Sequence, residues 1–180
     1  MEKEDSLAIK NQLVESLTEE IKEAFGDVKF PTHRGLHAAI AMDDWVDDPL
    51  ELKKITDEKD FKGKWWEIPA KEFAKNDFSL ATCYFDEYGT EFYLPAFLIF
   101  VINDKTGLFY NRLVYWLLPS EEDELYDYFC NQFSKINASE KQVCIKVLKY
   151  IKQHLLDPRD IFLKQDIEHI INHEFWLHEK

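Results

Sequence analysis

The residue types best suited to chemistry lie close together in a segment rich in histidine and aspartate. This segment contains His33, His37, Asp43, Asp44, Asp47 and Asp48. On a helix that begins near Leu36, His37 and Asp44 share a face because they are seven positions apart. An imidazole beside carboxylates can bind a divalent metal ion or act as an acid–base pair. An acidic helix end, with His37 packed or solvated, explains the same residues and is the interpretation we favour.

A second pair of histidines, His169 and His173, has the i, i+4 spacing that places two side chains on one face of a helix. The pattern is not that of a zinc protease, because Ile170 stands where the general-base glutamate would follow the first histidine. No third or fourth ligand is evident in the sequence. A partly exposed helix face is therefore the favoured interpretation.

Other catalytic patterns are missing from the sequence. It has no Gly-x-Ser-x-Gly elbow and no glycine-rich nucleotide-binding motif, and it contains only five glycines. The cysteines Cys83, Cys130 and Cys144 form no Cys-x-x-Cys pair, so they indicate neither a disulfide framework nor a zinc ribbon. We expect buried thiols, with Cys83 in the core because it lies on an apolar helical pattern, and no cofactor.

The composition favours a single globular domain over residues 1–180, since 46% of the residues are hydrophobic and 15% are aromatic. The net charge of −13 argues against nucleic-acid binding, because phosphate contacts need a basic surface. A basic protein partner, or solubility alone, suits this charge. The first residues show no secretory signal pattern, so we expect a cytoplasmic location and no membrane association.

The longest apolar run, residues 92–102, predicts the element around which the chain is organised. It is too short for a membrane span and is typical of a buried segment in a soluble core. We interpret residues 91–103 as a central buried helix, with Thr90 as N-cap and Pro95 near its start. The alternative is a β-hairpin over residues 96–118, with a turn at 103–107.

Helical spacing of apolar residues extends over most of the remaining chain. A first helix should end before Gly26, and an Asn137–Glu140 capping box should begin another helix. The remaining expected helices cover residues 36–45, 49–58, 70–75, 78–85, 108–118, a segment that begins with the acidic residues 120–124, and 160–177. The sequence thus predicts an all-α fold, a compact helical array. Two aromatic residues, Trp65 and Tyr93, could anchor a protein partner if they are exposed beside the acidic segment.

Three sequence blocks carry a family resemblance: His-Ala-Ala-Ile-Ala-Met-Asp-Asp-Trp at 37–45, Trp-Trp-Glu-Ile at 65–68, and the block at 85–97 that ends in Tyr-Leu-Pro-Ala-Phe. On these blocks the chain resembles a bacterial family known only as a domain of unknown function. The resemblance covers about residues 25–155 and leaves the helix at 160–177 outside. It implies a mainly helical bacterial protein and supplies no activity, so no catalytic residue is assigned.

Two functions are the main candidates from the sequence, and a purely structural subunit of a larger assembly is a third possibility. The first is a non-enzymatic interaction protein, such as an immunity or antagonist protein, that uses its acidic and aromatic surface to bind a basic protein. The second is a metal-assisted hydrolase centred on His33, His37, Asp43 and Asp44. The sequence leaves the oligomeric state open.

Overall fold

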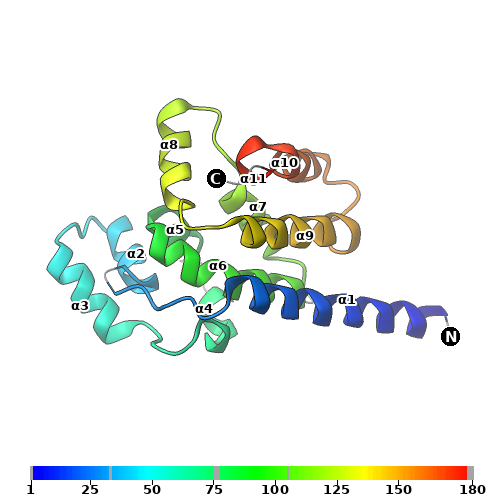
Figure 1. Cartoon of the computed structure of the whole chain (residues 1–180), viewed down its shortest axis with the longest axis horizontal. Helices are drawn as coiled ribbons and strands as arrows, with labels where there is room; N and C mark the ends of the chain where they lie inside the picture. Colours follow the sequence, from blue (N-terminus) through cyan, green and yellow to red (C-terminus); the bar gives the residue numbers. More distant parts are fainter. Residues whose placement is uncertain (1, 33, 75–77, 105, 178–180) are drawn as a thin grey trace.

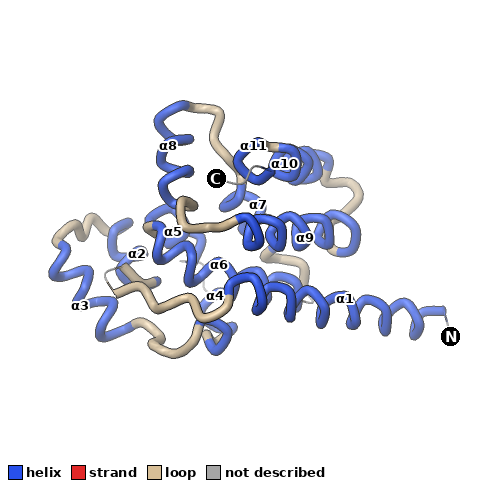
Figure 2. The backbone as a smooth tube through the Cα atoms, viewed as in Figure 1, coloured by secondary structure: helices blue, strands red, loops and turns tan. Residues whose placement is uncertain are grey.

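The protein is built from helices (Figure 1). The computed structural model describes residues 2–32, 34–74, 78–104 and 106–177, with side chains from residue 8 onward, and this part of the chain contains no strand (Figure 2). The all-α prediction is confirmed, and the alternative hairpin at 96–118 is wrong because two helices occupy that region. The elements are α1 (Glu2–Phe25), α2 (Leu36–Asp43), α3 (Pro49–Lys59), the 3-10 turn η1 (Trp65–Glu67), α4 (Ala70–Ala74), α5 (Phe78–Tyr84), α6 (Glu87–Asn103), α7 (Tyr110–Leu117), α8 (Asp123–Gln132), α9 (Ala138–His154), α10 (Ile161–Asn172) and α11 (Glu174–Leu177).

Helix α6 is the central buried helix that the apolar run predicts, and all of residues 92–98 are buried. Its start differs from the prediction. The side chain of Asp86, rather than Thr90, caps the helix by accepting a hydrogen bond from Gly89 N at 2.8 Å. Pro95 therefore lies inside the helix. Because proline has no N–H, the carbonyl of Glu91 lacks the donor that a helix normally provides.

Aromatic rings fill the core around α6. The ring of Phe97 lies 4.5 Å from that of Phe78, 5.6 Å from that of Phe73 and 6.2 Å from that of Trp116, measured between centroids. All four side chains are buried. Each buried ring of this size contributes about 2–3 kcal/mol of transfer free energy, so α4, α5 and α7 are held to α6 chiefly by apolar burial.

The other helices pack in two groups around this centre. Helix α1 lies against α6 and α9, and α10 and α11 lie against α9. Helices α2 and α3 pack on each other, and α2 packs on α5. Figure 1 shows α2 and α3 at the end of the molecule opposite the N-terminal half of α1, which runs out past the other helices. The histidine- and aspartate-rich segment thus lies at one end of the fold.

Several helix ends follow the local sequence signals. Gly26 has φ of +47° and donates to Lys22 O at 2.9 Å, as expected after the first helix. The predicted capping box of α9 is present, since the side chains of Asn137 and Glu140 each accept from the other's backbone N–H. The predicted final helix is instead divided at His173 into α10 and α11. None of the helices in the described ranges is both long and apolar enough to span a membrane.

Candidate functional site

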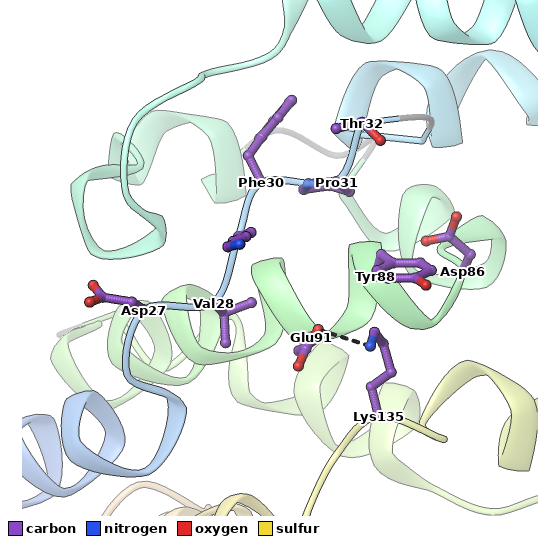
Figure 3. Close-up of a pocket in the computed structure, with 10 residues that line it drawn as sticks. Asp27, Val28, Phe30, Pro31, Thr32, Asp86, Tyr88, Glu91 and Lys135 are labelled. Atoms are coloured by element: carbon purple, nitrogen blue, oxygen red, sulfur yellow. Dashed lines mark ion pairs between the residues drawn. The ribbon is translucent and has the colours of Figure 1, made fainter.

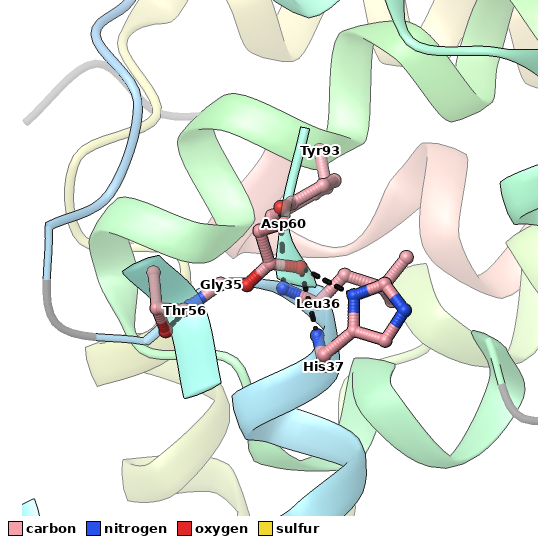
Figure 4. Close-up of polar contacts among 6 residues, drawn as sticks. All are labelled: Gly35, Leu36, His37, Thr56, Asp60 and Tyr93. Carbon is pink, nitrogen blue, oxygen red and sulfur yellow. Dashed lines mark hydrogen bonds and ion pairs between the residues drawn. The ribbon is translucent and has the colours of Figure 1, made fainter. Parts of the chain in front are cut away.

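His37 lies in the first turn of α2, where it contacts a buried carboxylate from the end of α3. Its backbone N–H and its ring Nδ1 both reach Asp60 Oδ1, at 2.9 and 2.8 Å (Figure 4). The Asp60 side chain is 1% exposed and the His37 side chain is 28% exposed. Because a carboxylate accepts hydrogen bonds, Nδ1 is assigned as the donor. The acid beside His37 is thus Asp60, and not Asp43 or Asp44.

Neighbouring contacts show that this pair completes the N-terminal cap of α2. Gly35 N donates to Thr56 Oγ1 at 3.0 Å, and Leu36 N donates to Tyr93 OH at 3.1 Å (Figure 4). Together with the bond from the His37 amide, these contacts satisfy donors that a helix start leaves free. A negative carboxylate also stabilises the positive end of the helix dipole. His37 and Asp60 therefore have a sufficient structural role.

Gly35 is needed for this close approach. A Cβ added at Gly35 would lie 2.0 Å from Asp60 Oδ2, a separation that real Cβ atoms do not show. Within the described part of the chain, Oδ2 is buried without a hydrogen-bond donor. Burial and the nearby Asp60 carboxylate raise the pKa of Tyr93, so its phenol stays protonated. The contacts of the cluster are those of a helix cap, in which the neutral Tyr93 phenol accepts from Leu36 N.

The four aspartates of the segment 43–48 are all exposed. Asp43 accepts a hydrogen bond from Tyr84 OH at 3.1 Å, which raises the pKa of Tyr84, and Asp48 caps α3 by accepting from Leu50 N at 3.1 Å. Asp44 is the C-cap residue of α2. These are the contacts of an acidic helix end, the interpretation favoured from the sequence.

A metal centre finds no support in this segment. His33 lies outside the described residues, and the described residues contain no group of three or more histidine, cysteine, aspartate or glutamate side chains that could hold a metal ion. A cavity of about 230 Å³ beside His37 is lined by Lys59, Lys71 and Glu72 among other described residues, none of which is a serine, threonine or cysteine. The predicted convergence of His37 with Asp43 and Asp44 is replaced by the contact with Asp60.

The residue that sequence reasoning missed is Trp45, which follows α2. Its φ is +64°, and it is the only non-glycine residue with positive φ in the described part of the chain. Trp45 N donates to Met42 O and Val46 N donates to Ala41 O, both at 3.1 Å. These two bonds define a Schellman motif, in which the residue after the C-cap is left-handed and is usually glycine. The geometry thus favours glycine, yet the position holds the largest side chain.

The Trp45 side chain makes little contact with its own protein, since the residue is 94% exposed. Leu50, at the start of α3, is 77% exposed. We call residues 43–50 the tryptophan loop. It combines two large exposed apolar side chains with four exposed aspartates, and it is the only described place where an exposed tryptophan adopts a left-handed backbone. The signal in the sequence is a tryptophan between paired aspartates at a helix end.

Trp65 and Tyr93 do not meet the condition of exposure under which they would anchor a partner. Trp65 is fully buried, and its indole Nε1 donates to Gly26 O at 2.9 Å. Tyr93 is 1% exposed and stacks on Phe85 with 4.9 Å between ring centroids. Both residues are parts of the core, and Trp65 ties the connection before α4 to the end of α1.

The second histidine pair lies at the end of α10. The rings of His169 and His173 are 5.3 Å apart, and His173 Nδ1 accepts a hydrogen bond from Phe175 N at 3.1 Å. Burial and the neighbouring His169 lower the pKa of His173. His173 is the C-cap of α10, so its ring closes the turn into α11. This is a structural contact at a helix end.

The protein is thus all-helical and acidic, with one hydrophobic core and an exposed tryptophan in a left-handed backbone conformation. The chain belongs to DUF6714, a family of unknown function, whose model matches residues 13–177. The match extends beyond the region 25–155 in which the sequence blocks lie, and it includes α10. No curated protein and no solved structure matches the chain.

Proposed function

We propose that the protein is a non-enzymatic interaction protein that binds a basic protein partner through the tryptophan loop, in the manner of an immunity or antagonist protein. The observation that carries this proposal is Trp45, which is 94% exposed at a backbone position of φ +64°. A left-handed conformation costs a non-glycine residue about 1–2 kcal/mol. Because Trp45 gains almost no burial in return within the chain, a contact outside the chain accounts for this residue type.

The chemistry of the loop sets the chemistry of the partner. Tryptophan is enriched among the residues that dominate binding energy, and burying the exposed indole together with Leu50 provides an apolar centre. The aspartates around them form the charged rim, which accelerates association with a basic surface and excludes acidic ones. The net charge of −13 also attracts a basic partner at long range. The partner surface should therefore be basic, with an apolar pocket.

We further propose that the protein acts in the bacterial cytoplasm. Cys83, Cys130 and Cys144 are all free thiols. The prediction that they are buried is confirmed for Cys144 and wrong for Cys83, which is exposed. Free cysteines suit a reducing compartment, where disulfides are rare. The thiols have no part in the proposed binding surface.

The test is affinity capture of the partner from native lysate, followed by binding kinetics with the purified partner. Trp45→Ser should weaken binding at least about thirtyfold, the loss typical of a central aromatic anchor of about 2 kcal/mol. Neutralising the four aspartates to asparagine should slow association and flatten its salt dependence.

Two matched controls separate a specific surface from bulk charge. Residues 121–124 are four exposed acids in another part of the chain, so converting them to the neutral amides changes the net charge equally. Tyr115, which is 61% exposed, provides an exposed aromatic elsewhere for Tyr115→Ala. Both controls should bind as the wild type does. Equal losses in the loop variants and in the controls, or a partner whose binding survives Trp45→Ser, would refute the proposal.

A further inference from the structure

A cavity of about 550 Å³ lies between the segment that follows α1 and the first turns of α6 (Figure 3). Its walls include Val28, Phe30 and Pro31 on one side, and Tyr88 and Glu91 from α6 on the other. Lys135, from the connection between α8 and α9, extends into the same space (Figure 3). This volume lies within the range of small-molecule sites, which are mostly apolar with a few placed polar groups.

The ammonium group of Lys135 is held by the two kinds of contact that recognise an organic cation. Its Nζ lies 4.5 Å from the centre of the Tyr88 ring, and 4.0 Å from Glu91 Oε2. An aromatic face and a carboxylate both attract an ammonium ion. The separation from Glu91 is longer than a hydrogen bond, and the Lys135 side chain is 34% exposed. The chain's own cation is therefore held loosely enough for another to replace it.

The charges around the cavity favour a second cation. Its lining carries the carboxylates of Asp27, Asp86 and Glu91 against the ammonium groups of Lys29 and Lys135. The Asp27 carboxylate is 88% exposed and lies 3.9 Å from Lys64 Nζ, so it is already paired. If Lys135 swings into solvent, Asp86 and Glu91 are left with Lys29 as the one lining cation. Burial raises the pKa of Glu91, and the charge of Lys135 lowers it. A carboxylate in this environment gains from any cation that approaches it.

We propose that this cavity binds a primary alkylammonium group, which displaces the Lys135 ammonium from between Tyr88 and Glu91, while the apolar wall receives the attached methylene chain. The group belongs either to a free aliphatic diamine or to a lysine side chain of another protein. The site shares no residue with the tryptophan loop, so it stands or falls independently of the proposed function.

The experiment is calorimetric titration of the full chain with cadaverine and, separately, with Nα-acetyl-lysine methylamide. Lys135→Met should tighten binding by about fivefold, because the internal competitor is gone, and Tyr88→Leu should weaken it by about fivefold through loss of the cation–π contact. The matched control is Lys149→Met, which removes the charge of another exposed lysine, in α9. It should leave the affinity within about twofold of wild type. The neutral probe 1,5-pentanediol should not bind.

The two probes identify the source of the ammonium group, since tighter binding of cadaverine indicates a free diamine and tighter binding of the lysine derivative indicates a protein side chain. Equal gains in Lys135→Met and Lys149→Met would show general charge attraction and overturn the proposal. The proposal would also be overturned if neither probe bound Lys135→Met at millimolar concentration. Because Tyr88 is 51% exposed, Tyr88→Leu should fold normally, which circular dichroism checks.

Discussion

Glu140 makes the stability of the protein sensitive to pH. It lies in the first turn of α9, is 3% exposed, and accepts a hydrogen bond from Asn137 N at 2.7 Å. Burial raises its pKa to about 7, and the nearby Glu91 carboxylate adds to the rise, while the bond from Asn137 and the charge of Lys135 oppose it. The perturbation that isolates this group is Glu140→Gln, since glutamine can keep the capping-box hydrogen bond without titrating.

The direction in which stability changes with pH follows from the protonation of Glu140 in the folded and the unfolded chain. Below pH 4.5 the carboxyl is protonated in both the folded and the unfolded chain, so this group does not lower the free energy of unfolding. Between pH 4.5 and about 7 the unfolded chain loses the proton first, so the free energy of unfolding falls as the pH rises. A rise from 4.5 to about 7 is about 2.5 pKa units, which sets a ceiling of about 3.4 kcal/mol. Relaxation of the folded chain and water penetration around the ionised carboxylate reduce this to about 1–2 kcal/mol.

The assay is urea unfolding of the wild type and Glu140→Gln at pH 5, 6, 7 and 8. The variant should match the wild type near pH 5 and exceed it by about 1–2 kcal/mol at pH 8. The difference between the two curves removes the contribution of the other carboxylates. Glu121→Gln, at an exposed position, makes the same change in charge and should give a constant difference. Parallel curves for Glu140→Gln and wild type would refute the reasoning.

Three further outcomes are expected from single substitutions, each measured by urea unfolding. Gly35→Ala should destabilise the protein by about 2–4 kcal/mol, because its Cβ would lie 2.0 Å from Asp60 Oδ2; a loss below 0.5 kcal/mol would contradict this packing. Trp45→Gly should raise the free energy of unfolding by up to about 1 kcal/mol, because φ of +64° suits glycine, and it should abolish binding to the proposed partner. A destabilised variant would show that the indole packs against its own chain. Tyr150→Phe should be neutral or slightly stabilising, because the buried Tyr150 hydroxyl has no hydrogen-bond partner among the described residues; a loss above 1 kcal/mol would reveal one.

Local signals predicted those parts of the fold that local physics determines. The apolar run at 92–102 predicted the buried helix, and Asn137 with Glu140 predicted a capping box, because in each case the deciding residues are neighbours in sequence. The start of α6 was misplaced because Asp86 and Thr90 are both good caps, and tertiary packing, which buries Thr90, favours the earlier one.

The candidate site was less predictable for the opposite reason. His37 contacts Asp60, which is 23 positions away, and no helical spacing connects them. Exposure is equally invisible to sequence patterns: Trp65 and Trp45 are both tryptophans beside charged residues, yet one is fully buried and the other is 94% exposed. The positive φ of Trp45 and the Schellman bonds at the end of α2 show that Trp45 occupies a position suited to glycine.

The cap of α2 has a consequence for the order in which the chain folds. An isolated eight-residue helix is too short to persist in water, and the three backbone donors at its start are bonded to Thr56, Asp60 and Tyr93. The last of these lies 57 positions beyond Leu36. During synthesis from the N-terminus, α2 therefore has to wait for α6 before it becomes stable, and the tryptophan loop acquires its shape only then. The proposed binding surface should be among the last features of the molecule to form, so truncated or partly unfolded chains should not compete for the proposed partner.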